Sequence, residues 1–297
     1  MAFFNNKKHK KSTTETTDYI ETFDIDSNGN FTSTELIHTY WWDVTTNFGD
    51  LIGPWLITLM TDRPVSNSKY LNINRTIFTV GSIIEHASNF PNQKISIWGS
   101  GLIQPLDNPK KIKKLRRCQI DKILAVRGSL TRQELSKIYE IDNSLPLGDP
   151  ALLLPRFFSP SLKNINHISI VPHFNHKSLF ESYEDTFNII NVMQSPKNVI
   201  AEIASSKICI STSLHGIIIA QAYNIPWLLL RIADETLLGD MFKFNDFFST
   251  LKGEEFPIKT ILASDLRNLD FNKLATEASL IPIETNLNDL LDAFSME

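Results

Sequence analysis

The chain has 297 residues, a length that predicts about two domains, and 42% of them are hydrophobic, as in an ordinary globular protein. Lys and Arg total 29 against 33 Asp and Glu, and the formal net charge of −4 disfavours a general nucleic-acid binder. Two cysteines, Cys118 and Cys209, exclude a disulfide scaffold and a cysteine-rich zinc site. No apolar run reaches the ~18 residues of a membrane span or forms a signal peptide, so we expect a cytoplasmic protein.

Residues 1–35 form a polar N-terminal extension, and residues 24–35 match the sequence pattern of an EF-hand-like calcium loop. The ligands would be Asp24, Asp26, Asn28, Asn30 and Glu35, with Asn30 acting through its carbonyl and Glu35 bidentate. Only one such loop is visible, whereas EF-hands usually pair. Its exiting helix would also compete with the strand expected from residue 36, so calcium binding and a chance match both stay open.

From residue 36 onward, short apolar runs alternate with amphipathic stretches. We expect strands at residues 36–42, 76–80, 94–98 and 122–126 in a first domain, residues 36–155. Residues 156–167 lack a period and predict an interdomain linker. In a second domain, residues 168–297, we expect strands near residues 167–171, 187–192, 208–211 and 227–232, with helices at 198–205 and 214–223. The alternation predicts an α/β fold with mostly parallel sheets and a ligand cleft between two units.

The first strand leads into a glycine-containing turn, Asn47-Phe-Gly-Asp50, that opens a predicted helix. Because the carboxyl ends of parallel strands face the ligand in such sheets, Asn47 and Asp50 would lie at the cleft. The alternative is that both side chains only cap the helix, and the spacing alone favours that alternative.

Small residues follow the next two expected strands, in residues 80–84 and 97–101. Glycine and serine let a ligand approach the backbone, which makes Ser82, His86 and Ser100 candidates for the cleft. Glycine also follows strands for purely steric reasons, and His86 taken alone is more typical of a structural histidine.

Arg127 ends an apolar strand just before a helix expected to start near Ser129. Its guanidinium could hold a phosphate or carboxylate through two parallel hydrogen bonds, or it could pair with a nearby acid. Asp149, in the tight turn at residues 147–151, could cap a helix or pair with Arg127. The sequence leaves these alternatives open.

The sharpest catalytic signal is Ser211-Thr-Ser-Leu-His-Gly216, where a strand runs into a very apolar helix. His215 would lie in the first helical turn, whose free N–H groups favour an anion and disfavour the imidazolium form. A neutral histidine beside an anion is suited to general acid or base catalysis. The alternative is a capping serine followed by an incidental histidine. His173, which ends another expected strand, is a weaker candidate.

Residues 110–117 carry six positive charges in eight positions. This pattern is typical of a solvated helix face. It would also suit peripheral contact with a membrane, through attraction to anionic lipid head groups or lipid-linked phosphates.

In chain order, these motifs resemble those of the polysaccharide pyruvyl transferase family, and the bacterial exopolysaccharide ketal pyruvyltransferases most nearly. The resemblance covers about residues 36–232. The matching segments are Asn47-Phe-Gly-Asp50, Gly81-Ser-Ile-Ile84, Trp98-Gly-Ser-Gly101, Val126-Arg-Gly128, Gly148-Asp-Pro-Ala-Leu-Leu-Leu154, Val171-Pro-His173, Ser211-Thr-Ser-Leu-His-Gly216 and Ala222-Tyr-Asn-Ile-Pro226. The resemblance implies a GT-B-like α/β fold with two Rossmann-like domains and a cleft between them.

The resemblance also implies an enzyme that transfers pyruvate from phosphoenolpyruvate to a sugar of a surface-polysaccharide precursor, forming a pyruvate ketal. The acceptor would be a glycan or a lipid-linked oligosaccharide at the inner face of the membrane, and no metal or other cofactor would be required. On this reading His215 is the general acid or base and Asp50 orients or activates the acceptor hydroxyl. The donor would be bound by Arg127, Ser213, Leu214 and Gly216, and the acceptor or cleft side would include Asn47, Ser82, His86, Ser100 and His173.

One departure from the family concerns the last motif, where many members have Arg-Leu-His and this chain has Ser213-Leu214-His215. The bacterial subgroup with Ser-Leu-His shares it, and there the serine and the helix amides would have to replace one anion contact. Two other functions stay open. A GT-B-type glycosyltransferase would use a nucleotide-sugar, since a fold does not fix the donor. A calcium-responsive binding protein would have no catalysis.

Overall fold

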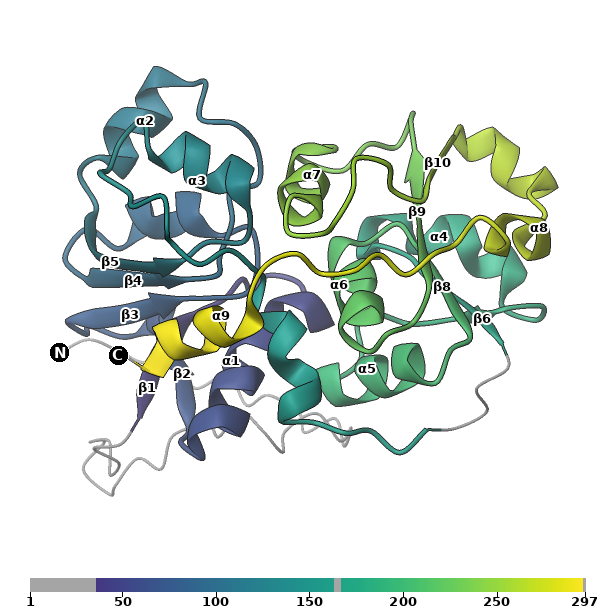
Figure 1. Ribbon diagram of the computed structural model, residues 1–297, viewed down its shortest axis with the longest axis horizontal. Helices are drawn as coiled ribbons and strands as arrows, with labels where there is room; N and C mark the ends of the chain where they lie inside the picture. The colour runs from purple at the N-terminus through teal and green to yellow at the C-terminus, as the bar shows by residue number, and fades with distance from the viewer. Residues whose placement is uncertain (1–35, 163–166, 296–297) are drawn as a thin grey trace, which may run out of the picture.

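The first domain is built on a parallel sheet of five strands in the order β2-β1-β3-β4-β5. In the computed structural model, which describes residues 36–162 and 167–295, this sheet and a second one lie side by side (Figure 1). The strands of the first sheet are β1 (Ile37–Tyr40), β2 (Val65–Asn67), β3 (Arg75–Phe78), β4 (Lys94–Trp98) and β5 (Gln119–Ala125). The proposed calcium loop, residues 24–35, lies outside the described residues.

The second domain repeats the same topology with the order β10-β9-β8-β6-β7, again all parallel. Its strands are β6 (Ile168–Val171), β7 (Asn188–Ile189), β8 (Ile208–Ser211), β9 (Trp227–Ile232) and β10 (Ile258–Ile261). Both sheets therefore have a switch point where the strand order reverses, between β1 and β3 and between β6 and β8. Ligands of such sheets bind outside the carboxyl ends of the strands at that point. The predicted α/β fold with two Rossmann-like domains is confirmed.

Helices connect the strands of both sheets. They are α1 (Phe48–Thr61), α2 (Pro109–Leu115), α3 (Ser129–Leu135), α4 (Lys177–Phe180), α5 (Pro196–Ala204), α6 (Leu214–Ala222), α7 (Phe242–Phe248), α8 (Phe271–Ala275) and α9 (Leu287–Ser295). The expected helices at 198–205 and 214–223 correspond to α5 and α6. Within the described ranges, no helix is long and apolar enough to cross a membrane.

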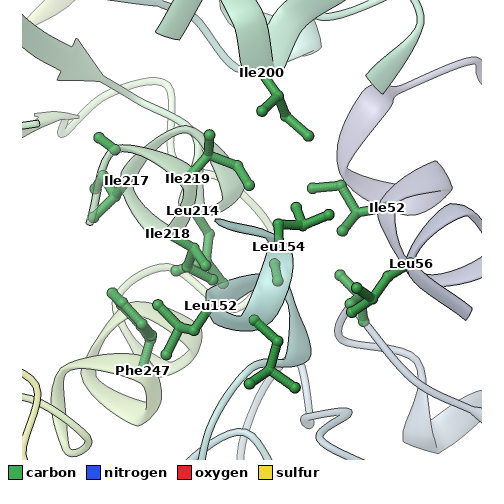
Figure 2. Packing of buried hydrophobic residues seen from close by; sticks show 14 of the residues in the cluster. Ile52, Leu56, Leu152, Leu154, Ile200, Leu214, Ile217, Ile218, Ile219 and Phe247 are labelled. Carbon is green, nitrogen blue, oxygen red and sulfur yellow. The ribbon is translucent and has the colours of Figure 1, made fainter. Parts of the chain in front are cut away.

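A shared hydrophobic core joins the two domains. Its centre is the 3₁₀ segment η3 (Pro150–Arg156), whose Leu154 lies between α1 and α6 in Figure 2. Ile52 of α1 and Ile218 of α6 are fully buried in the same cluster. Burying each such side chain contributes ~1.5–3 kcal/mol, so this interface stabilises one arrangement of the cleft walls.

The chain returns to the first domain at its C-terminal end. In Figure 1 the yellow segment runs from α8 back across the molecule to α9, beside the first sheet. There the Trp98 indole Nε1 donates to the Leu290 carbonyl at 2.8 Å, and the Trp98 and Phe294 ring centroids are 4.5 Å apart. Residues 287–295 follow the second sheet in sequence but pack against the first.

Candidate active site

A cavity of about 620 Å³ lies between the two domains at the carboxyl ends of their strands. Its walls include the loops that follow β1 and β3 in one domain and β6 and β8 in the other, so both switch points face the same space. Several residues proposed from sequence line it, namely Asn47, Asp50, Ser82, His86, His173, Ser213, Leu214 and His215.

Asn47 and Asp50 combine the two roles that the sequence left as alternatives. Asn47 Oδ1 caps α1 by accepting from the Gly49 N–H at 3.4 Å, and its Nδ2 donates to Asp50 Oδ2 at 3.0 Å. Burial raises the pKa of Asp50 to about 7, although the Asn47 hydrogen bond and the Lys243 charge both oppose the rise. The Asp50 carboxyl can therefore exchange a proton near neutral pH.

His215 occupies the first turn of α6 and packs against the start of α1. A Cβ built on Gly49 would come within 2.4 Å of His215 Nδ1, so the imidazole lies almost directly on the glycine. Burial, together with the charges of Arg127 and Lys243, lowers the pKa of His215 to about 3, so the ring is neutral at neutral pH. The fold thus brings together the turns at residues 47–50 and 211–216, as the sequence analysis expected.

Lys243 is a site residue that the sequence analysis missed. Its side chain enters the cavity from α7 and the residue is 7% exposed. Among the described residues, no hydrogen bond or ion pair reaches its Nζ, which lies 5.6 Å from the ring centroid of Phe244. Burial lowers the pKa of Lys243 to about 8, with the charge of Arg127 also lowering it and Asp50 and Asp240 opposing. The signal in the sequence is one lysine between Phe242 and Phe244, in a helix that is otherwise mostly aromatic.

Arg127 is not free to hold a donor, and the structure corrects that assignment. The side chain is fully buried, and Nε donates to Asp246 Oδ2 at 3.0 Å. Nη1 donates to Ser82 Oγ at 2.6 Å and Nη2 to the Leu102 carbonyl at 2.7 Å. Arg127 therefore pairs with the nearby acid Asp246 and not with a ligand, and this contact links α7 to the first domain. Asp149 takes the capping alternative, since Oδ1 accepts from the Ala151 N–H at 3.0 Å.

Two further sequence assignments, Gly216 and Ser100, are wrong in this structure. Gly216 packs against the end of β8, where an added Cβ would lie 2.3 Å from Ser211 Oγ, and it does not line the cavity. Ser100 is fully buried and donates to the Gly81 carbonyl at 2.9 Å. Both positions need small residues because the chain is closely packed there, which is the steric alternative that sequence alone could not exclude.

His173 and His86 lie at the cavity wall, each held by a neighbour. His173 Nδ1 accepts from the Asn175 N–H at 3.2 Å, and burial lowers the pKa of His173 to about 3, with nearby positive charge contributing. His86 Nδ1 lies 2.8 Å from the Tyr40 hydroxyl, and its pKa is lowered by burial. These histidines present neutral, polar ring edges to a ligand. In the described part of the chain, no group of three or more His, Cys, Asp and Glu side chains is placed to hold a metal.

Comparison with known proteins places the chain in a family. It is 28% identical over 249 residues to the uncharacterized protein L143 of Acanthamoeba polyphaga mimivirus, covering 80% of this chain and 82% of that protein. It is 27% identical over 224 residues to the succinoglycan biosynthesis protein ExoV of Rhizobium meliloti (strain 1021), covering 71% of this chain and 64% of ExoV.

Among solved structures, the wall teichoic acid polymerase TagF matches with a TM-score of 0.39 and 10% identity, over 88% of this chain and 83% of that chain. We draw nothing further from a likeness this weak. The model of the polysaccharide pyruvyl transferase family matches residues 56–234, more than half of the chain. The chain belongs to the polysaccharide pyruvyl transferase family, and it is a pyruvyltransferase enzyme that acts on polysaccharide.

Proposed function

We propose that the enzyme takes its pyruvyl group from phosphoenolpyruvate and attaches it, as a ketal, to a sugar of a surface-polysaccharide precursor. One observation carries this proposal: the buried Lys243 ammonium has no hydrogen-bond or ion-pair partner among the described residues, and it shares the cavity with the start of α6. A helix start and an unpaired cation together favour a small, dense anion. Phosphoenolpyruvate carries both a phosphate and a carboxylate.

Lys243 would also compensate for the arginine that is missing from the motif at residues 213–215. The chain has Ser213 where many relatives have arginine, and Arg127 is fully paired within the protein. Lys243 would supply the missing positive charge from a different element, α7. As a point charge it would hold either anionic group of the donor without the fixed geometry of a guanidinium.

The first chemical step adds an acceptor hydroxyl across the donor's double bond. Asp50 is suited to give a proton to carbon 3, because its pKa of about 7 keeps much of it protonated near neutrality. The hydroxyl oxygen forms a bond to carbon 2, and neutral His215 takes the hydroxyl proton. Binding of the anionic donor beside Lys243 would offset the charge that lowers the pKa of His215, and so make the ring more basic in the complex. This assignment exchanges the roles that the resemblance gave to Asp50 and His215.

The second step closes the ketal ring. The bond between carbon 2 and the phosphate oxygen breaks, and phosphate leaves with the proton held by His215. A second hydroxyl forms a bond to carbon 2 and returns its proton to Asp50. The new methyl group then carries the proton from Asp50, which the second hydroxyl has replaced, and phosphate carries the proton of the first hydroxyl, so both side chains are back in their starting states.

The acceptor would enter along the outer part of the cavity. Trp42 is 39% exposed there and offers a flat apolar face, to which the face of a sugar ring can bind. Lys111 and Lys114 of α2 line the same part, and Lys111 pairs with Glu85 at 2.9 Å. Leu238, 67% exposed, lies at the other wall. Apolar and basic groups together suit a sugar carried on a lipid-linked phosphate at the inner face of the membrane.

The proposal is tested by phosphate release from phosphoenolpyruvate in the presence of a panel of β-galactosides and other hexosides. We expect release that depends on an acceptor and yields a ketal methyl signal by NMR. His215→Ala should lose the activity, whereas His38→Ala should keep it, because His38 of β1 bonds Ser66 of β2 and does not line the cavity. Turnover of a nucleotide-sugar with no phosphate release from phosphoenolpyruvate would overturn the proposal and support the glycosyltransferase alternative.

A further inference from the structure

Two buried polar atoms, one of them on the cavity residue His215, face each other without a partner in the described part of the chain. Nε2 of His215 and Oδ2 of Asp149 are 4.0 Å apart, and within the described ranges neither has a hydrogen bond. The Asp149 side chain is fully enclosed and His215 is 12% exposed. Buried polar atoms are nearly always hydrogen-bonded, so such a facing pair of unpaired atoms needs an explanation.

The position of Asp149 is fixed by its other oxygen. Oδ1 caps η3 through the Ala151 N–H, which leaves Oδ2 directed at the histidine. Asp246, a second fully buried aspartate nearby, provides a contrast. Its Oδ1 accepts from the Thr131 N–H, and its Oδ2 accepts from Thr131 Oγ1 and Arg127. Both carboxylate oxygens of Asp246 are therefore hydrogen-bonded, whereas Oδ2 of Asp149 has no hydrogen bond within the described ranges.

We infer that Asp149 is a positioning residue for His215: it holds the ring proton on Nε2 and leaves the Nδ1 lone pair facing the cavity. Resting on the proposed function, this assigns Nδ1 as the atom that takes the hydroxyl proton. An ionised carboxylate only accepts hydrogen bonds, so the nitrogen facing it must carry hydrogen. Because Nε2 is enclosed, Nδ1 is the nitrogen left to face the ligand.

The distance of 4.0 Å fits a contact that closes during the reaction. Catalytic hydrogen bonds are often long before substrate binds and tighten in the complex, and a shift of about 1 Å would bring this pair to bonding distance. Once His215 has taken a proton, an ionised Asp149 would stabilise the imidazolium. Burial raises the pKa of Asp149 to about 6, with the Ala151 N–H and Arg127 opposing and Asp246 contributing, so the carboxylate is still mostly ionised at neutral pH.

The decisive variant is Asp149→Asn. The asparagine oxygen can keep the cap on η3, so its NH₂ group must face Nε2 of the histidine. The ring would then adopt the opposite tautomer, with hydrogen on Nδ1 and no lone pair toward the cavity. We expect kcat to fall ~100-fold, the usual scale for losing a general base, with the affinity for phosphoenolpyruvate nearly unchanged.

The tautomer itself is read by ¹⁵N NMR of the full chain labelled in histidine, with the His215 signals identified by their loss in His215→Asn. We expect hydrogen on Nε2 in the wild type and on Nδ1 in Asp149→Asn. Asp270→Asn is the matched control, since Asp270 caps α8 far from the cavity in the same way and should change neither the tautomer nor kcat.

A wild-type ring with hydrogen on Nδ1, or an Asp149→Asn enzyme with unchanged tautomer and kcat, would overturn the inference. If Asp149→Asn does not fold, the tautomer of the wild type still decides. The NMR measurement needs no turnover. If the NMR confirms hydrogen on Nε2 but the protein is inactive with phosphoenolpyruvate, the proposed function is refuted. The inference that Asp149 positions His215 would still hold.

Discussion

Gly49 and His215 come from different domains and touch so closely that a methyl group on the glycine would lie 2.4 Å from Nδ1 of the imidazole. Gly49 belongs to the turn that places Asp50, and His215 to the turn that opens α6. One contact across the cleft therefore positions the two groups that we propose to transfer protons. Asn47-Phe-Gly-Asp50 and Ser211-Thr-Ser-Leu-His-Gly216 therefore pack together, although residues 51–210 separate them in the sequence.

We predict that Gly49→Ala displaces the imidazole and lowers kcat ~100-fold, since a misplacement of about 1 Å can cost that much. The ring can turn away from the new methyl group, so the fold should survive. Gly53→Ala is the control on the same helix, because its added Cβ would meet the Thr79 methyl at 2.6 Å, away from the histidine. The prediction would be contradicted if Gly49→Ala and Gly53→Ala lowered the melting temperature equally and also lowered kcat equally.

Lys243 should bind the donor in a pH-dependent way. Its pKa is lowered to about 8, so its charge, and with it the affinity for phosphoenolpyruvate, is expected to fall as pH rises through 8. Lys243→Met should weaken binding at least ~10-fold at pH 7, the effect of losing about 1.4 kcal/mol. Lys243→Arg should keep binding at pH 9, because arginine does not lose its charge there. Calorimetric titration across this pH range provides the measurement, and a wild-type affinity that stays constant from pH 7 to 9 would exclude the role.

The same lysine should reduce stability. Its pKa is lowered from 10.5 to about 8, so between these values the folded chain binds fewer protons than the unfolded chain. Below pH 8 the buried charge therefore lowers the free energy of unfolding. This destabilisation disappears as pH rises toward 10.5. Lys243→Met should therefore raise the melting temperature at pH 7 while it weakens donor binding, the pattern of a residue kept for function. A lower melting temperature in Lys243→Met would indicate a structural role instead.

The raised pKa of Asp50 should make the stability of the protein depend on pH. Its pKa is raised from 3.8 to about 7, so the folded chain binds more protons than the unfolded chain between these values. The free energy of unfolding should then decrease as pH rises from 4 through 7. Asp50→Asn removes this dependence, so its melting temperature should exceed that of the wild type by at least ~2 °C at pH 8, but not at pH 4. The exposed Asp107→Asn serves as control, and a difference that does not change with pH would count against the raised pKa.

Short-range pattern was enough to predict much of the fold. Apolar runs located β1, β3, β4 and β5, and the motifs that follow strands placed Asn47, Asp50 and His215 at the cleft. The missed strands have physical reasons. In β2 only Val65 is apolar, and β10 is an edge strand with a half-exposed Ile-Lys-Thr-Ile sequence.

Long-range contacts could not be read from the sequence. Arg127 pairs with Asp246, 119 residues away, so no local pattern distinguishes a structural guanidinium from one that holds an anion. Lys243 lines the cavity because α7 packs at the cleft, and α9 contacts the first sheet through Trp98. The sequence could therefore predict that Asp50 and His215 share a site, but not the source of its positive charge.

The calcium loop stays a prediction from sequence. If residues 24–35 bind calcium, the full chain should bind one ion with a dissociation constant in the range of ~10⁻⁷ to 10⁻³ M that such loops span. Glu35→Gln should weaken binding at least ~10-fold, because it removes the bidentate carboxylate at the twelfth position. Glu140→Gln, outside the loop, should not, and magnesium should bind more weakly than calcium. Calorimetry of the chelator-treated protein gives the answer. If calcium gives no heat of binding, or the same heat in Glu35→Gln as in the wild type, the pattern is a chance match.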